Sequence, residues 1–273
     1  MIELELKDFD IAKIARSGQC FRFRPLPEGG GYALAALGRY LEIRQQGGRV
    51  RFGCGPQEFE AVWRAYFDLD ADYGALCAAI DPRDSYLQAA ARCAAGVRIL
   101  RQDVWETILA FILSQQNNIP RIQKCLEALC TAYGQPFENS RGEVYWGVPA
   151  PEVLAAADES ALRGLGLGYR ARYVRTAAQQ VACGQVDLKA LAGLPYEQAR
   201  GKLLELCGVG VKVAECVCLF GLHHVDAFPI DTHIKQMLAA HYGQGFPLQR
   251  YKGFAGILQQ YAFYYELYGE DGA

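Results

Sequence analysis

The spacing of apolar residues changes along this chain near residue 90. Before that point, residues 31–53 (GYALAALGRYLEIRQQGGRVRFG) alternate between apolar and polar positions and contain the pair Gly47-Gly48. Alternation with a glycine turn predicts a β-hairpin. Residues 2–6 and 20–24 are also rich in strand-forming side chains, so further strands are expected there. This half of the pattern predicts an N-terminal domain that contains an antiparallel sheet.

After residue 90, apolar residues recur at the three- and four-residue spacing of amphipathic helices. This spacing predicts helices over residues 104–116, 121–134, 171–184, 196–207, 211–221, 231–243 and 251–267. The fold class is therefore α+β, with an N-terminal domain over residues 1–94 and an all-helical domain over residues 95–273. The last helix is expected to pack back across both domains.

Composition and charge narrow the class of protein. The net charge is −2 and the pI is about 6.1, so a protein that is basic over its whole surface is excluded, and nucleic acid would need a local basic patch. The first twenty residues contain no apolar core of a secretory signal, and no run of eighteen uncharged apolar residues predicts a membrane span. The ten cysteines are scattered without a C-x-x-C motif, which indicates reduced core thiols. A cytoplasmic protein is expected.

Residues 206–235 (LCGVGVKVAECVCLFGLHHVDAFPIDTHIK) raise the first question of chemistry. Gly208 and Gly210 stand between two predicted helices, where glycines permit a tight turn and the second helix offers free N–H groups to a phosphate. An ordinary turn between helices would look the same. Lys212 opens the apolar helix that follows, although burial of an ammonium is costly. Its side chain must either reach water or do chemistry.

A carboxylate lies downstream of this lysine. Asp231 occupies the expected N-cap of the next helix, where it could simply cap the helix or could also stabilise a developing positive charge. Lys212 and Cys216 are four residues apart and so share one helix face.

The chain resembles the helix–hairpin–helix DNA glycosylases, and within them the 8-oxoguanine DNA glycosylase branch. The resemblance spans nearly the whole chain and rests on blocks that occur in the order of the family. These blocks are SGQCFRF (17–23), GVRILRQDVWETILAFILSQQNNIPRI (96–122), LGLGYRARYV (165–174), CGVGVKVAECVCL (207–219), PIDTH (229–233) and FAGILQQYAF (254–263). The resemblance implies an N-terminal α+β domain of the 8-oxoguanine glycosylase type and a helical catalytic domain.

The family's chemistry places specific demands on these residues. An amine can displace the damaged base and form a Schiff base, and the sugar can then lose its 3′ phosphate by β-elimination. A lysine must be neutral to attack, and an apolar setting such as VKVAECVCL favours the neutral amine. The resemblance therefore implies that Lys212 is the nucleophile, that Asp231 stabilises the sugar's positive charge, and that His233 contacts a phosphate. His233 could alternatively be a partly exposed helix histidine.

A flipped base needs a stacking surface and groups that read its edges. By resemblance, Phe263 stacks on one face of the base, Cys216 lies on the other, and Gln259 reads the Watson–Crick edge. Gln259 and Phe263 are four residues apart, so one helix face can supply both. The distinctive donor of 8-oxoguanine is N7–H, and the resemblance implies that the carbonyl of Gly18 accepts it.

The base left behind also needs readers. The resemblance implies that Tyr169 is the wedge and that Arg170 and Arg121 read the opposite cytosine, although both arginines could instead bind phosphate. Gln116 stands where the family has an asparagine that touches the cytosine, so a weaker cytosine preference is expected. Residues 160–186 hold four arginines and no acid, which gives this region local positive charge.

The sequence shows no metal-ligand spacing. The related iron–sulfur glycosylases carry four cysteines after the catalytic aspartate, whereas the last cysteine of this chain precedes Asp231. No iron–sulfur cluster or other cofactor is therefore expected. Carbonyls of Cys207 and Val209 could hold a monovalent cation. The predicted function is a bifunctional DNA glycosylase and AP lyase that acts as a monomer on double-stranded DNA containing oxidised guanine. It would be nucleoid-associated in a bacterium or nuclear in a eukaryote. The alternatives are a glycosylase of the same fold for another damaged base and a non-catalytic DNA-binding module.

Overall fold

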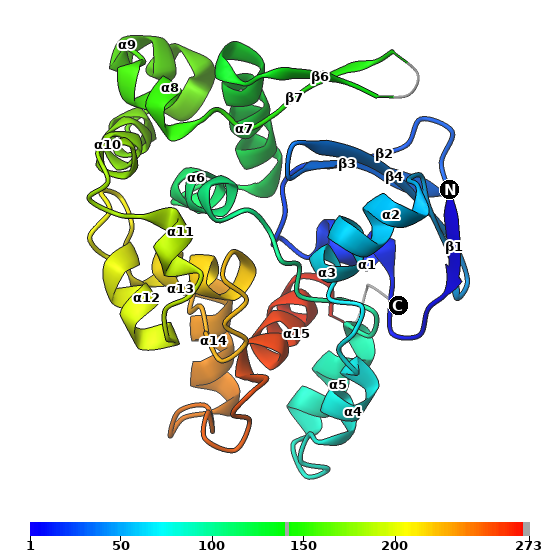
Figure 1. Ribbon diagram of the computed structural model, residues 1–273. Coiled ribbons are helices and arrows are strands. Elements are labelled where there is room, and N and C mark those ends of the chain that lie inside the picture. The colour runs from blue at the N-terminus through cyan, green and yellow to red at the C-terminus, as the bar shows by residue number, and fades with distance from the viewer. Residues whose placement is uncertain (140–141, 270–273) are drawn as a thin grey trace.

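The N-terminal part is built on five antiparallel strands in the order β1-β5-β4-β3-β2, in a computed structural model that describes residues 1–139 and 142–269 (Figure 1). Inward-facing residues of the strands, among them Leu34, Leu41, Val50 and Phe52, are completely buried. The strands are β1 (Ile2–Glu5), β2 (Phe23–Pro25), β3 (Gly31–Ala36), β4 (Arg39–Gln46) and β5 (Arg49–Phe52).

Short helical segments cover one face of this sheet. Trp63 of η1 packs against Phe67, which directly follows α3, and Phe67 packs against Phe52 of the sheet; these rings belong to a core separate from that of the helical part. The segments are α1 (Ile11–Arg16), α2 (Pro56–Glu58), the π-helical η1 (Phe59–Trp63) and α3 (Arg64–Tyr66).

The rest of the described chain is mainly helical. Two helices precede the connection to the main helical part: α4 (Tyr73–Ala78) and α5 (Ser85–Cys93). The following elements are α6 (Val104–Ser114), α7 (Ile119–Tyr133), α8 (Pro151–Ala156), α9 (Glu159–Leu162), the π-helical η2 (Arg163–Leu167), α10 (Arg170–Ala182), α11 (Leu188–Leu191), α12 (Tyr196–Leu203), α13 (Val211–Phe220), α14 (Thr232–His241) and α15 (Ala255–Tyr268). This arrangement confirms the predicted α+β class.

The last helix lies at the centre of the molecule. Figure 1 shows α15 between α14 and α5, and both pairs are in contact. Tyr268 of α15 donates a hydrogen bond to the carbonyl of Arg16 in the N-terminal part. Helix α15 therefore contacts both α14 of the helical part and the segment at Arg16 of the N-terminal part.

Several local predictions were wrong in strand number or element bounds; α12, for example, ends at Leu203 and not at residue 207. The segment 31–53 holds three strands rather than two, because Leu37 and Gly38 both have positive φ and form a second turn. Helix α6 ends at Ser114, two residues early, and α15 begins four residues late, after Gly253 with φ +94°. A small hairpin of β6 (Pro136–Glu138) and β7 (Val144–Trp146), which the sequence did not predict, reaches over the sheet (Figure 1).

A buried polar cluster joins the N-terminal part to the helical part. The carboxylate of Asp68 accepts hydrogen bonds from Arg101 at 2.8 Å and Tyr73 at 3.1 Å, and Nε2 of His223, which follows α13, lies 3.3 Å away. Burial by itself would raise the pKa of Asp68, but His223 and Arg101 outweigh it and lower that pKa to about 2. The ionised carboxylate therefore stabilises the folded chain.

Within the described residues, no helix has both the length and the apolar character needed to cross a membrane.

Asp68→Asn is expected to lower the free energy of unfolding by about 2 kcal/mol at pH 7. The reason is that the folded state favours the ionised carboxylate more than the unfolded state does, and a neutral amide loses this difference. A lowered pKa stabilises the fold fully above the unfolded-state pKa, and this stabilisation is lost as the pH falls through about 2. The difference between wild type and variant should therefore shrink to roughly half at pH 3. Urea unfolding at both pH values measures it.

The matched control is Asp70→Asn, which removes an exposed ion pair with Arg64 and should cost less than about 1 kcal/mol at either pH. A loss for Asp68→Asn that is the same at pH 7 and pH 3 would contradict the assigned ionisation.

Candidate active site

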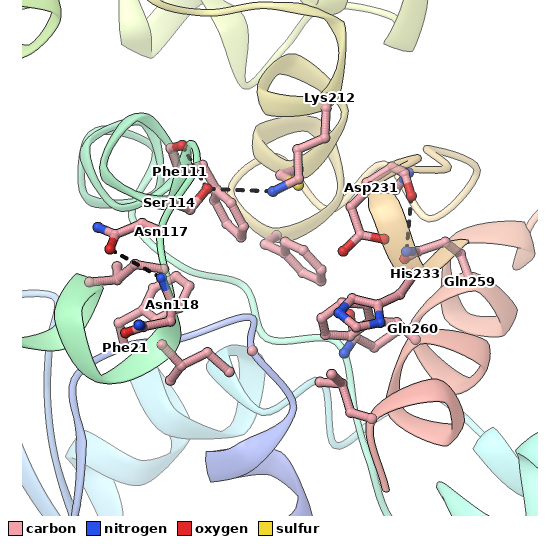
Figure 2. Close-up of a pocket in the computed structure, with 18 of the residues that line it drawn as sticks. Phe21, Phe111, Ser114, Asn117, Asn118, Lys212, Asp231, His233, Gln259 and Gln260 are labelled. Carbon is pink, nitrogen blue, oxygen red and sulfur yellow. Dashed lines mark hydrogen bonds between the residues drawn. The ribbon is translucent and has the colours of Figure 1, made fainter. Parts of the chain in front are cut away.

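A cavity of about 430 Å³ lies where α6, α7, α13, α14 and α15 meet the segment that follows α1 (Figure 2). Its wall combines apolar rings with a small number of polar groups, which is the composition of sites that bind small organic groups. The lining residues are Gly18, Phe21, Phe111, Ser114, Asn117, Asn118, Ile119, Pro120, Ile122, Lys212, Cys216, Phe220, Pro229, Asp231, His233, Gln259, Gln260, Phe263 and Leu267.

Lys212 enters this cavity from the first turn of α13. Its half-buried side chain places Nζ 3.4 Å from Oγ of Ser114 and 4.9 Å from the ring centre of Phe111 (Figure 2). One turn later, burial raises the pKa of the Cys216 thiol to about 11, although the charge of Lys212 acts in the opposite direction. Cys216 is therefore a neutral wall of the cavity, and Lys212 is the amine that a substrate would meet.

Asp231 faces the same cavity from the start of α14. Its Oδ1 accepts a hydrogen bond from the backbone N–H of Ile234 at 2.9 Å, so the residue is the N-cap that the sequence predicted. Figure 2 shows the carboxylate and the amine of Lys212 projecting from neighbouring helices toward one space. The helix N-terminus favours the negative charge there.

A second carboxylate fixes the position of the loop between α13 and α14. Glu215, which is nearly buried in α13, accepts hydrogen bonds from Tyr196 at 2.7 Å, from Arg200 at 2.5 Å and from the backbone N–H of Phe228 at 3.0 Å. These bonds join α12, α13 and the loop that leads to Asp231. The sequence reasoning overlooked Glu215, although an acid within the apolar run VKVAECVCL was a usable signal.

The four residues predicted to hold a base all line the cavity. The side chain of Gln259 is 4% exposed, and its Nε2 donates to the carbonyl of Pro229 at 3.0 Å. Its Oε1 is buried without a partner, which leaves an acceptor free for a ligand. Gly18 has φ +76°, and a Cβ there would lie 3.0 Å from the ring of Phe263. A glycine is thus required for the backbone to approach so closely.

The residues predicted to act on the opposite base lie outside the cavity wall. Tyr169 is 41% exposed, whereas Arg170 is only 4% exposed. The guanidinium of Arg170 donates to the carbonyls of Gln115 and Gln116, the latter at 2.9 Å. Gln116 itself is exposed with φ +47°, and Arg121 is exposed on the first turn of α7. The structure brings Tyr169, Arg170 and Gln116 together and leaves Arg121 open to solvent.

The hairpin before α13 is closely packed on one side. Gly208 has φ +80°, and a Cβ there would lie 2.5 Å from Cβ of Tyr173, so only glycine fits. Gly210 is the exposed N-cap of α13, and because it has no side chain, it forms no capping bond to the first N–H groups of the helix. The N–H of Cys207 donates to Oε1 of Gln180 at 2.7 Å, which anchors the turn to α10. His233 is half-buried, with its ring perpendicular to that of Phe263.

In the part of the chain that the structure describes, no three His, Cys, Asp or Glu side chains are grouped so that they could hold a metal ion. The predicted cation at the carbonyls of Cys207 and Val209 stays a prediction.

Comparison with known families and proteins gives a consistent result. Residues 1–108 match the model of the 8-oxoguanine DNA glycosylase N-terminal domain, and residues 109–246 match that of the HhH-GPD superfamily base excision DNA repair proteins. The chain is 36% identical over 158 residues to the N-glycosylase/DNA lyase of Saccharomyces cerevisiae. That match covers 54% of this chain and 42% of the yeast protein, so this chain aligns with less than half of that relative.

Two solved structures resemble the whole fold. MBOgg1 in complex with a low affinity DNA ligand is 34% identical with a TM-score of 0.90, and the match covers 96% of this chain and 93% of that one. The Clostridium acetobutylicum 8-oxoguanine glycosylase/lyase, in complex with dsDNA containing cytosine opposite to 8-oxoG, is 31% identical with a TM-score of 0.87, and the match covers 95% and 92%. These matches confirm the resemblance inferred from the sequence: the chain belongs to the HhH-GPD superfamily of base excision DNA repair proteins and carries the N-terminal domain of the 8-oxoguanine DNA glycosylases.

Proposed function

We propose that this protein excises 8-oxoguanine from double-stranded DNA and then cleaves the strand as an AP lyase, acting as a monomer. The observation that carries this proposal is the arrangement of Lys212 and Asp231 around one cavity that also holds the unpartnered acceptor of Gln259. A nucleophile, a stabilising carboxylate and a group that reads a base edge meet at one place. The names of the relatives support the same activity.

The amine of Lys212 supplies the covalent chemistry. In its neutral form the amine attacks C1′ of the deoxyribose. The electron pair of the N-glycosidic bond leaves with the base, and the departing base takes up a proton. Loss of the amine proton and opening of the sugar ring give a Schiff base. Removal of a C2′ proton then expels the 3′ phosphate, and water hydrolyses the remaining imine to release Lys212.

Asp231 stabilises the positive charge that develops on the sugar while the base departs. Its role as N-cap fixes one oxygen on Ile234, so the carboxylate is held in place before the reaction begins. A preorganised charge in a partly dry cavity stabilises a transition state more than a mobile one does.

The flipped base fits between Phe263 and the buried wall at Cys216. Oε1 of Gln259 is fixed as an acceptor because its amide nitrogen is engaged by Pro229. An acceptor at this position suits the N1–H and N2–H donors of guanine-type bases. The carbonyl of Gly18 would then accept the N7–H that distinguishes 8-oxoguanine from guanine, whose N7 is an acceptor.

The remaining predicted residues contact the DNA duplex around the flipped base. Tyr169 fills the space left by the flipped base, and Arg121 is the exposed donor for the estranged cytosine. Gly208, Gly210 and His233 contact phosphates near the lesion, where the free N–H groups at the start of α13 favour negative charge. The region from residue 160 to 186 holds four arginines and no acid, and its exposed members Arg163 and Arg172, unlike the buried Arg170, attract the rest of the DNA backbone.

The direct test of the function is single-turnover cleavage of duplexes that carry different lesions opposite each of the four bases. Preferred excision of 8-oxoguanine is expected. Preferred excision of another damaged base would replace the substrate assignment, and binding without any cleavage would favour a DNA-binding module.

Lys212→Gln is expected to abolish borohydride trapping of the protein on lesion DNA, because no other amine projects into the cavity from the described residues that line it. The trapped complex is measured by denaturing electrophoresis. Lys235→Gln, an exposed lysine on α14, should trap normally. A Lys212→Gln variant that still cross-links at the wild-type rate would show that Lys212 is not the nucleophile.

Asp231→Asn is expected to keep the N-cap oxygen and to cost less than about 1 kcal/mol of stability, while turnover falls by about a hundredfold or more. Thermal unfolding and single-turnover excision measure the two effects. Asp187→Ala, which removes the N-cap of α11 outside the cavity, should lower stability but leave excision unchanged. If Asp231→Asn loses excision rate only in proportion to its loss of stability, the carboxylate is only a cap.

Arg121→Ala is expected to flatten the preference for 8-oxoguanine opposite cytosine by about tenfold, since a charged hydrogen bond contributes roughly 1.5–3 kcal/mol. Arg172→Ala on the exposed side of α10 is the control for loss of charge alone. An equal drop for all four opposite bases in both variants would make Arg121 a phosphate contact. Arg170→Ala is not expected to flatten the opposite-base preference in the same way, because the guanidinium of Arg170 donates to backbone carbonyls in the described structure.

A further inference from the structure

The segment that presents Gly18 is held by buried amide side chains on both sides. Nε2 of Gln19 donates to Oγ of Ser17 and to the carbonyl of Arg98, each at 2.8 Å. The backbone N–H of Leu100 donates to Oε1 of Gln19, also at 2.8 Å. This side chain therefore fixes residues 17–19 to residues 98–100, in the segment that precedes α6.

The carbonyls on either side of Gly18 are also engaged. Nε2 of Gln102 donates to the carbonyl of Gln19 at 2.7 Å, and Nε2 of Gln260 donates to the carbonyl of Ser17 at 2.6 Å. Among the hydrogen bonds of the described residues, none is made to the carbonyl of Gly18 itself. The carbonyl of Gly18 is thus a free acceptor between the carbonyls of Ser17 and Gln19, which already accept hydrogen bonds.

Gln260 makes its contact from the far end of the chain. It is 2% exposed, Ser17 is completely buried, and the two residues are 243 positions apart in the sequence. Gln260 directly follows Gln259 on α15, so the two side chains leave the helix about 100° apart. Gln259 engages the carbonyl of Pro229, while Gln260 engages the carbonyl of Ser17 beside Gly18.

This bond matters because Gly18 has no Cβ to restrict its backbone. A glycine at φ +76° can rotate its peptide groups more freely than any other residue, so the direction of its carbonyl is set by neighbouring contacts. The bond from Gln260 fixes the peptide that joins Ser17 to Gly18. Without it, the buried carbonyl of Ser17 would lose its partner, and the segment would move to satisfy it.

We infer that Gln260 is a positioning residue for lesion recognition: it holds the carbonyl of Ser17 so that the next carbonyl, that of Gly18, faces N7–H of 8-oxoguanine. This inference rests on the proposed function. It assigns to α15 two separate tasks in selecting the base, one performed by Gln259 on the base itself and one performed by Gln260 through the backbone of the N-terminal part.

The test compares two reactions of the same protein. Excision of 8-oxoguanine opposite cytosine requires recognition of the base, whereas incision of a preformed abasic site requires Lys212 but no base. Gln260→Leu and Gln260→Met both remove the donor and keep a side chain of similar size. Each variant is expected to slow excision by about tenfold relative to incision of the abasic site, the size of effect associated with one misplaced hydrogen bond.

A second measurement reports selectivity directly. In a Lys212→Gln background, which does not react, the ratio of the dissociation constants for guanine and 8-oxoguanine duplexes is expected to decrease when Gln260→Leu is added. Thr107→Val is the matched control, because it removes the bond from the hydroxyl of the buried Thr107 to the carbonyl of Asp103, the N-cap of α6, outside the cavity. It should leave both ratios unchanged.

The outcomes separate the two proposals. If both Gln260 variants retain the wild-type ratio of excision to abasic-site incision, whether both rates stay the same or fall together, Gln260 is only structural and the inference is overturned. If the wild-type protein cuts abasic sites but does not excise 8-oxoguanine, the proposed substrate is wrong, whatever the variants do.

Discussion

The buried carboxylate of Glu215 is the contact on which the geometry of the site depends. Lys212 precedes it by three residues on α13, and Asp231 follows Phe228 by three residues, so one carboxylate links the helix of the amine to the loop of the acid. A buried charge is tolerated only when it is paired and hydrogen-bonded. Here Tyr196, Arg200 and the N–H of Phe228 satisfy it together. The hairpin and the loop are therefore fixed relative to each other before a substrate arrives.

The N-terminal part contributes to the same cavity through its backbone. Its sheet carries none of the side chains assigned to the covalent chemistry, but the segment after α1 places Gly18 against Phe263. Asp68 and the buried guanidinium of Arg98, which donates to carbonyls of Asp8 and Ala71, hold this part in position. A recognition element made of backbone must be held by its surroundings, because it has no side chain of its own to anchor it.

The contacts of Arg170 differ from those expected of the role that its sequence motif suggested. The LGLGYRARYV block favoured a reader of the opposite base, and the structure instead shows the guanidinium bound to the carbonyls of Gln115 and Gln116. Those bonds support the left-handed conformation of Gln116 at the point where α6 ends. In the present conformation Arg170 thus shapes the loop beside Tyr169, the proposed wedge, whereas Arg121, like Arg172, is exposed to solvent.

The sequence by itself located most of the elements and the residues that we propose to react. Periodicity located α13 and α15, the four-residue spacing paired Gln259 with Phe263, and the cap pattern placed Asp231 at the start of α14. Such features depend on neighbours within one or two turns, which a sequence displays directly. The exit of the chain from α6 at Gln116 and the partners of Arg170 did not follow, because they depend on residues some fifty positions away. Only the tertiary structure decided that Glu215 joins the hairpin to the loop and that Gln260 meets Ser17, since hydrogen bonds between distant segments exist only after the two cores have packed and brought them together.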